Sequence, residues 1–221
     1  MQIKEDLKVN DFKVRYQKIN WNKYFKLTSL RVSFLALILA LNIVLAVFSK
    51  FVLGLIQIPP VTFLVLELTL ITYFILLYVI NLFYTIVFIF LATWMRFFIG
   101  DEPIGMLAMN LIDIVSVLTF WIVNFLVYKL VIGYIKTQKQ HLITLYISQG
   151  TAGLFAAFAA AGFGVLINWA FLLKLYGVPE ESRDYLLIPI LIFNFVKIVI
   201  NLIIYLSIFY AIDLLFKRYD I

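Results

Sequence analysis

Three polar side chains share one face of an otherwise apolar segment near the C-terminus. The segment FNFVKIVIN, residues 193–201, contains Asn194, Lys197 and Asn201. Spacings of three and four residues place all three on the same face of a helix. Ionisable groups in an apolar segment of membrane length are costly and usually mark a ligand site or an ion path. We therefore predict that this face contacts a ligand, with hydrogen bonding between helices as the alternative.

Other charged groups in apolar segments give Lys197 two choices of partner. Its ammonium could snorkel to the membrane surface, or it could pair with Asp113 or Glu67. Glu67 and Arg96, which we place in the second and third helices, could instead form a structural ion pair. The sequence leaves these pairings open.

Three further polar residues have less specific interpretations. Asn168, beside Trp169, could cap a neighbouring element or line the same cavity as Lys197. Asp213 lies near the inner end of the last apolar segment, where we expect it to be hydrated. His141 lies in a polar stretch, and a metal site needs several convergent donors. We therefore expect His141 to be a solvated loop residue.

The composition places the chain among integral membrane proteins. Its 221 residues are 65% hydrophobic and 14% charged, which is far too apolar for a soluble domain of this size. Eight of the 18 Lys and Arg residues fall in residues 1–31, so the net charge of +6 does not indicate nucleic-acid binding. We interpret residues 1–28 as a cytoplasmic arm resting on lipid headgroups, with a disordered basic tail as the alternative.

The remaining residues, 29–221, have room for six membrane spans of about 20 apolar residues each. We expect helices at 29–50, 104–129, 143–174 and 187–215, and two more within 61–100 that turn near Asn81. The connection after the fourth helix and the C-terminal tail are basic, whereas the loops containing GDEP and PEESRD are mainly acidic. Since basic loops stay in the cytoplasm, both termini are predicted to be cytoplasmic.

Two runs of small residues predict close helix packing. Ala36 and Ala40 are four residues apart in the first helix, and SQGTAGLFAAFAAAGFG leaves one face of the fifth nearly bare. Small residues at this spacing let helices approach closely in lipid. We expect internal packing for the fifth helix, whereas the first could dock a separate protein.

Several kinds of chemistry have no motif in this chain. It contains no cysteine, no phosphate-binding G-x-x-x-x-G-K-[ST] loop and no H-E-x-x-H pair. No Ser-His-Asp set or acidic cluster suited to two metals is present either. We therefore expect a protein that is not an enzyme and that has neither a metal site nor a resident cofactor.

Taken in order along residues 29–215, several motifs resemble one known family. After the Ala36 and Ala40 pair come PP at 59–60, GDEPIGMLAMN at 100–110, INWAFLLKLYG at 167–177 and FNFVK at 193–197. In this order the motifs resemble the substrate-binding S components of energy-coupling factor (ECF) vitamin transporters, and among them the riboflavin-specific branch.

The resemblance implies an external pocket built by helices 4 to 6, in which Asn168, Asn194 and Lys197 contact the flavin. Its chemistry agrees, because an asparagine amide offers a donor and an acceptor to the imide edge of the ring, and lysine can donate to a carbonyl or ribityl oxygen. Nearby aromatic side chains can stack on the ring. Asn201 and Asn110, the last residue of GDEPIGMLAMN, complete the candidate ligand contacts.

The resemblance also implies transport across a bacterial cell membrane. This subunit would capture riboflavin outside, and a transmembrane coupling subunit with two ATPase subunits would drive its release inside. Ala36 and Ala40 would contact the coupling subunit.

Three alternatives stay open at this point. The ligand could be another vitamin, such as thiamine, biotin or a folate. The chain could instead be a membrane-embedded enzyme of lipid metabolism that depends on Asp113 or Glu67, or a purely structural membrane protein.

Overall fold

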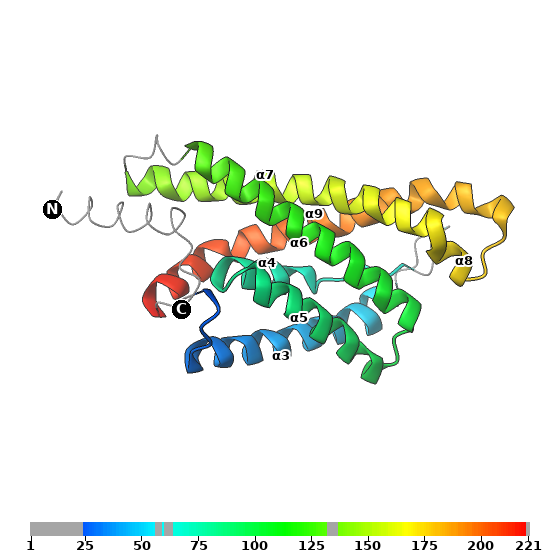
Figure 1. The fold of residues 1–221 in the computed structure, drawn as a ribbon, viewed down its shortest axis with the longest axis horizontal. Coiled ribbons are helices and arrows are strands. Elements are labelled where there is room, and N and C mark those ends of the chain that lie inside the picture. The colour runs from blue at the N-terminus through cyan, green and yellow to red at the C-terminus, as the bar shows by residue number, and fades with distance from the viewer. Residues whose placement is uncertain (1–23, 56–58, 60–63, 132–136, 220–221) are drawn as a thin grey trace.

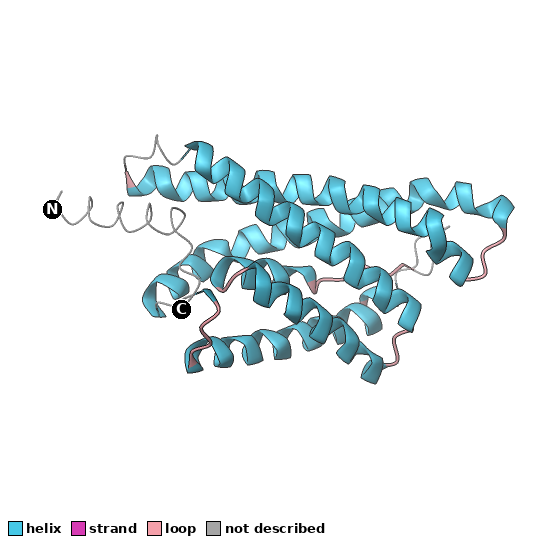
Figure 2. Cartoon of the chain, viewed as in Figure 1, coloured by secondary structure: helices cyan, strands magenta, loops and turns pink. Residues whose placement is uncertain are grey.

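The protein is an all-α integral membrane protein. The computed structural model describes residues 24–55, 59, 64–131 and 137–219, and every regular element among them is a helix (Figure 2). In chain order the elements are α3 (Ser29–Phe51), η1 (Leu53–Leu55), α4 (Leu70–Val79), α5 (Leu82–Met95), η2 (Arg96–Ile99), α6 (Pro103–Val131), α7 (Gln138–Ile167), the π-helical turn η4 (Asn168–Leu172), α8 (Leu173–Leu175) and α9 (Glu180–Tyr219).

Five helical segments of the described chain are long and apolar enough to cross a membrane. They are Ser29–Leu55, Leu82–Ile99, Pro103–Val131, Lys139–Leu175 and Glu180–Leu215. The predicted first and fourth helices are thus confirmed within a few residues of their expected ends. The fifth and sixth are confirmed as helices but begin earlier than expected, at Gln138 and Glu180. The predicted turn near Asn81 is also confirmed, because the Asn81 side chain accepts a hydrogen bond from the Tyr84 N–H and caps α5.

The predicted second helix differs from the structure. Only ten residues form α4, and the residues before it, 64–68, are not helical. The sequence prediction that Glu67 lies in a helix is therefore wrong. At about 3.3 Å per non-helical residue and 1.5 Å per helical residue, residues 64–79 can still extend about 30 Å, the thickness of the hydrocarbon core.

Non-helical backbone at membrane depth needs partners from the protein, since lipid supplies none. Two side chains from neighbouring helices provide them here. The Asn201 amide in α9 donates to the Glu67 carbonyl at 2.6 Å, and the Ser49 hydroxyl in α3 accepts from the Leu68 N–H at 3.1 Å. These bonds hold residues 64–68 inside the bundle.

Among the three longest helices, α7 packs against both α6 and α9 (Figure 1). The small-residue face of α7 lies in this contact, where Ala152, Ala156 and Ala160 are fully buried. A Cβ atom added to Gly153 would overlap the Leu202 side chain of α9. Internal packing is thus the role of the small residues in α7, as predicted.

The start of α3 and the end of α9 lie at the same end of the bundle (Figure 1). Beside them, the Asn81 amide donates to the Tyr24 carbonyl and the Tyr84 hydroxyl donates to the Phe25 carbonyl, both at 2.8 Å. The last residues of the predicted N-terminal arm are therefore attached to the turn between α4 and α5. The rest of that arm, residues 1–23, lies outside the described residues.

Two expectations about polar residues at this end are wrong. His141 lies within α7 and is buried, with its ring nitrogen 3.4 Å from the Tyr128 hydroxyl of α6. Asp213 is also buried, and it accepts a hydrogen bond from the Tyr78 hydroxyl at 2.7 Å. His141 is helical because α7 begins earlier than expected, and both side chains face the protein interior.

Candidate ligand-binding cavity

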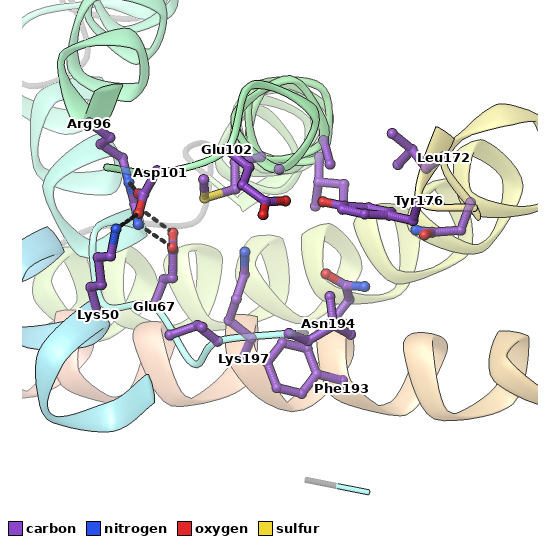
Figure 3. A pocket seen from close by; sticks show the side chains of 17 residues that line it. Lys50, Glu67, Arg96, Asp101, Glu102, Leu172, Tyr176, Phe193, Asn194 and Lys197 are labelled. Carbon is purple, nitrogen blue, oxygen red and sulfur yellow. Dashed lines mark hydrogen bonds and ion pairs between the residues drawn. The ribbon is translucent and has the colours of Figure 1, made fainter. Parts of the chain in front are cut away.

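A cavity of about 230 Å³ lies between α6, α9, the turn after α7 and the non-helical residues 64–68 (Figure 3). Its wall combines apolar side chains with convergent polar ones. The lining residues are Lys50, Leu64, Val65, Glu67, Arg96, Asp101, Glu102, Gly105, Ala108, Met109, Ile112, Asn168, Leu172, Tyr176, Phe193, Asn194 and Lys197. An apolar wall with a few placed polar groups is typical of a small-molecule site.

Three of the five predicted ligand contacts line this cavity: Asn168, Asn194 and Lys197. Each asparagine amide donates one hydrogen bond to the carbonyl four residues earlier, Asn168 to Gly164 at 2.8 Å and Asn194 to Ile190 at 2.9 Å. These bonds fix the side-chain orientation and leave each amide one N–H. No described group donates to either side-chain oxygen, so both asparagines keep a donor and an acceptor for a ligand.

Asn168 stands at the start of an irregular turn. The Leu173 N–H bonds to the Asn168 carbonyl five residues earlier, which makes residues 168–172 a π-helical turn. Single π turns inside α-helices are frequent at functional sites. The sequence left open whether Asn168 caps a neighbouring element or lines the cavity. In the structure its side chain bonds within its own helix and also lines the cavity.

Gly164 makes room for the two asparagines. Its carbonyl accepts the Asn168 hydrogen bond, and a Cβ atom at this position would lie 3.1 Å from the Asn194 side-chain nitrogen. A larger residue would therefore displace the Asn194 amide by a few tenths of an ångström. In the sequence this glycine is one of a run of small residues that predicts only helix packing, and its place opposite Asn194 requires the tertiary structure.

Lys197 pairs with Asp113 rather than with Glu67. The lysine Nζ lies 3.8 Å from the Asp113 Oδ1, which accepts no hydrogen bond from any described group. The ammonium points into the cavity (Figure 3). The long separation leaves its N–H groups available to a ligand while the aspartate offsets its charge.

Glu67 and Arg96 form an ion pair, one of the alternatives that the sequence left open, and the pair belongs to a larger network. Both ends of the Arg96 guanidinium contact the Glu67 carboxylate, with Nη1 2.7 Å from Oε2. Arg96 Nε also donates to Asp101 at 2.6 Å, and Asp101 pairs with Lys50 at 2.8 Å. The network joins α3, η2 and residues 64–68 along one wall of the cavity (Figure 3).

Tyr176 lies across the cavity from this network, Glu102 lies between the two, and both side chains point into the cavity (Figure 3). Burial, and then the Glu102 charge, raise the pKa of the Tyr176 hydroxyl above its ordinary value. That hydroxyl lies against Gly105, where an added Cβ atom would be 3.3 Å away. Glu102 is exposed, so the cavity reaches the protein surface beside it.

The other two candidate ligand contacts do not line the cavity. Asn201 donates to the carbonyls of Glu67 and Lys197, so it supports the wall from behind. Asn110 is buried in α6, and neither polar atom of its side chain has a described partner. Within the described residues, no group of three or more His, Asp or Glu side chains is placed to hold a metal ion.

Apart from Glu67 and Arg96, which were considered only as an ion pair, five charged or aromatic residues of the wall were not predicted as ligand contacts: Lys50, Asp101, Glu102, Tyr176 and Phe193. All of these five except Lys50 lie inside the motifs GDEPIGMLAMN, INWAFLLKLYG and FNFVK, which is the signal that could have identified them.

No protein-family model matches this chain, and a search of curated proteins finds no significant match.

Proposed function

We propose that this protein is a riboflavin-binding S component of an ECF-type vitamin importer in a bacterial cell membrane. In this role it captures riboflavin in an externally open cavity, and ATP-driven partner subunits complete the uptake. The protein itself is a binding subunit and not an enzyme.

The observation that carries the proposal is the convergence of Asn168, Asn194 and Lys197 on one cavity. These residues come from two separate segments of the chain, and each keeps free hydrogen-bonding capacity toward the cavity. The two amides match the donor and acceptor pattern of a flavin imide edge. Tyr176 and Phe193, which also line the wall, offer aromatic faces beside these polar groups.

The test is a riboflavin titration of the detergent-purified protein, after its absorbance has been checked for flavin carried through purification. Stacking and hydrogen bonding at the site should quench both tryptophan and flavin fluorescence, with saturation at one flavin per chain. Replacing Asn194 or Lys197 by alanine removes a hydrogen bond and leaves the polar atom of the flavin buried without a partner. Each variant should therefore bind riboflavin roughly ten- to a hundredfold more weakly. Thiamine and biotin serve as comparison ligands.

The chain supplies matched controls for both substitutions. Asn124 lies in α6 and Lys174 in α8, and neither lines the cavity. Asn124→Ala and Lys174→Ala should bind riboflavin as the unchanged protein does. A folded, flavin-free sample that gives no response to riboflavin would refute the riboflavin assignment.

The proposed coupling surface can be tested separately. Ala36 and Ala40 are exposed on α3, away from the cavity wall. Replacing both by leucine should block uptake in cells that contain the coupling and ATPase subunits, because close helix approach needs small side chains. Riboflavin binding by the purified variant should remain unchanged, and its loss would contradict the docking role.

A further inference from the structure

Within the part of the chain that the structure describes, every positively charged side chain of the cavity wall has a carboxylate beside it that offsets its charge. Lys50, Arg96 and Lys197 are the positively charged residues of the described wall. The first two are paired within the network that contains Glu67 and Asp101. Lys197 has Asp113 directly behind it.

Arg96 in particular is fully engaged. Its two terminal nitrogens contact Glu67 and its Nε contacts Asp101, and its side chain is only 7% exposed. A guanidinium recognises phosphate through the same planar fork. Since carboxylates already occupy that fork, Arg96 cannot receive a phosphate without breaking a buried ion pair.

The remaining charged group of the wall is negative. Glu102 points into the cavity beside the Tyr176 hydroxyl (Figure 3), and it forms no ion pair with any described residue. It directly precedes Pro103, so it stands at the N-terminus of α6, where a helix would otherwise favour an anion. Pro103 also lacks the N–H group that such an anion would use.

The residues of the first loop that lie outside the described structure do not change this balance. Residues 56–58 and 60–63 contain no Lys or Arg. Lys174, in the neighbouring turn, is exposed and is not part of the wall. The groups in and directly behind the described wall therefore carry a net negative charge, from Glu102.

We propose that this cavity selects flavins that carry no negative charge, and that Glu102 is the specificity-determining residue that disfavours 5′-phosphorylated flavins. This inference rests on the proposed function, which it narrows to the dephosphorylated vitamin. A phosphate monoester carries a charge of about −1.5 to −2 at pH 7, and here it would meet a carboxylate and no unpaired cation. Among the alternative vitamins, the carboxylates of biotin and folates are disfavoured for the same reason, whereas cationic thiamine is not.

The experiment compares riboflavin with flavin mononucleotide in the full-length purified protein at low ionic strength. The unchanged protein should bind the mononucleotide at least about 100-fold more weakly than riboflavin. Glu102→Gln removes the charge and keeps the side-chain shape, so it should reduce that ratio about tenfold while riboflavin affinity changes little. Glu181→Gln, an exposed carboxylate outside the cavity wall, is the matched control and should leave the ratio unchanged.

The outcomes separate the two proposals. Equal binding of riboflavin and the mononucleotide would overturn the charge selection and leave the riboflavin site standing. A large ratio that Glu102→Gln does not alter would overturn the role of Glu102. Failure of the folded protein to bind either flavin would overturn the proposed function and, with it, this inference.

Discussion

The buried pair of Glu67 and Arg96 gives the sharpest prediction about stability. Both side chains are 7% exposed or less, and the contact has two parallel hydrogen bonds. The pair attaches the non-helical residues 64–68 to η2. We consider Glu67→Gln, Arg96→Met and the double variant, which remove the negative charge, the positive charge and both.

The expected magnitudes follow from which charge is left without a partner. Removing one member of a buried ion pair costs about 3–5 kcal/mol, because the other charge stays buried and uncompensated. Glu67→Gln should lie at the low end, since Arg96 keeps Asp101 at 2.6 Å. Arg96→Met should lie at the high end, because Glu67 has no other described ion-pair partner. The double variant should lose less than the sum of the two single variants.

Thermal unfolding of the detergent-solubilised protein measures these differences. At about 2–4 °C per kcal/mol for a chain of this size, the single variants should unfold roughly 6–20 °C lower. Glu180→Gln is the control, because it removes a pair with Arg183 in which the glutamate side chain is 86% exposed. An exposed pair contributes about 0–1 kcal/mol. Equal midpoints for Glu67→Gln and Glu180→Gln would refute the reasoning.

Three further predictions concern packing, the site and pH. Gly153→Ala places a Cβ atom against Leu202 and should lower stability by about 1–3 kcal/mol, measured by thermal unfolding; an unchanged midpoint would contradict the close packing of α7 on α9. Gly164→Ala displaces the Asn194 amide and should weaken riboflavin binding severalfold, with little change in the unfolding midpoint. Because burial raises the pKa of Tyr176 above 10.0, the stability linked to its neutral hydroxyl is present below that pH and is lost as the pH rises further. Tyr176→Phe should show a smaller loss in unfolding experiments between pH 9 and 11, and an identical loss would oppose this assignment.

Much of the membrane fold follows from local properties of the chain. Long apolar runs near 20 residues or more predict spanning helices, and four of the six expected helices coincide with spanning segments, although the last two begin earlier than predicted. The turn at Asn81 was also predictable, since asparagine commonly caps a helix. The spacing of Asn194 and Lys197 placed both on one helix face, and both line the cavity.

Other features depend on contacts between distant segments. Residues 64–68 are as apolar as a helix would be, but their backbone is held by Ser49 and Asn201, which are remote in sequence. His141 looked solvated because its neighbours are polar, and Asp213 because it lies near the end of a span, whereas the folded helices turn both side chains into the interior.

The chain by itself therefore determined the class of protein, the approximate helices and the polar face of α9, because these depend on composition and helical periodicity. Only the tertiary structure decided which partner each charge has. In the structure Lys197 pairs with Asp113, and Arg96 forms ion pairs with both Glu67 and Asp101. Glu102 faces the cavity. The physical reason is that ion pairing falls off over a few ångströms, a distance that sequence separation does not reveal.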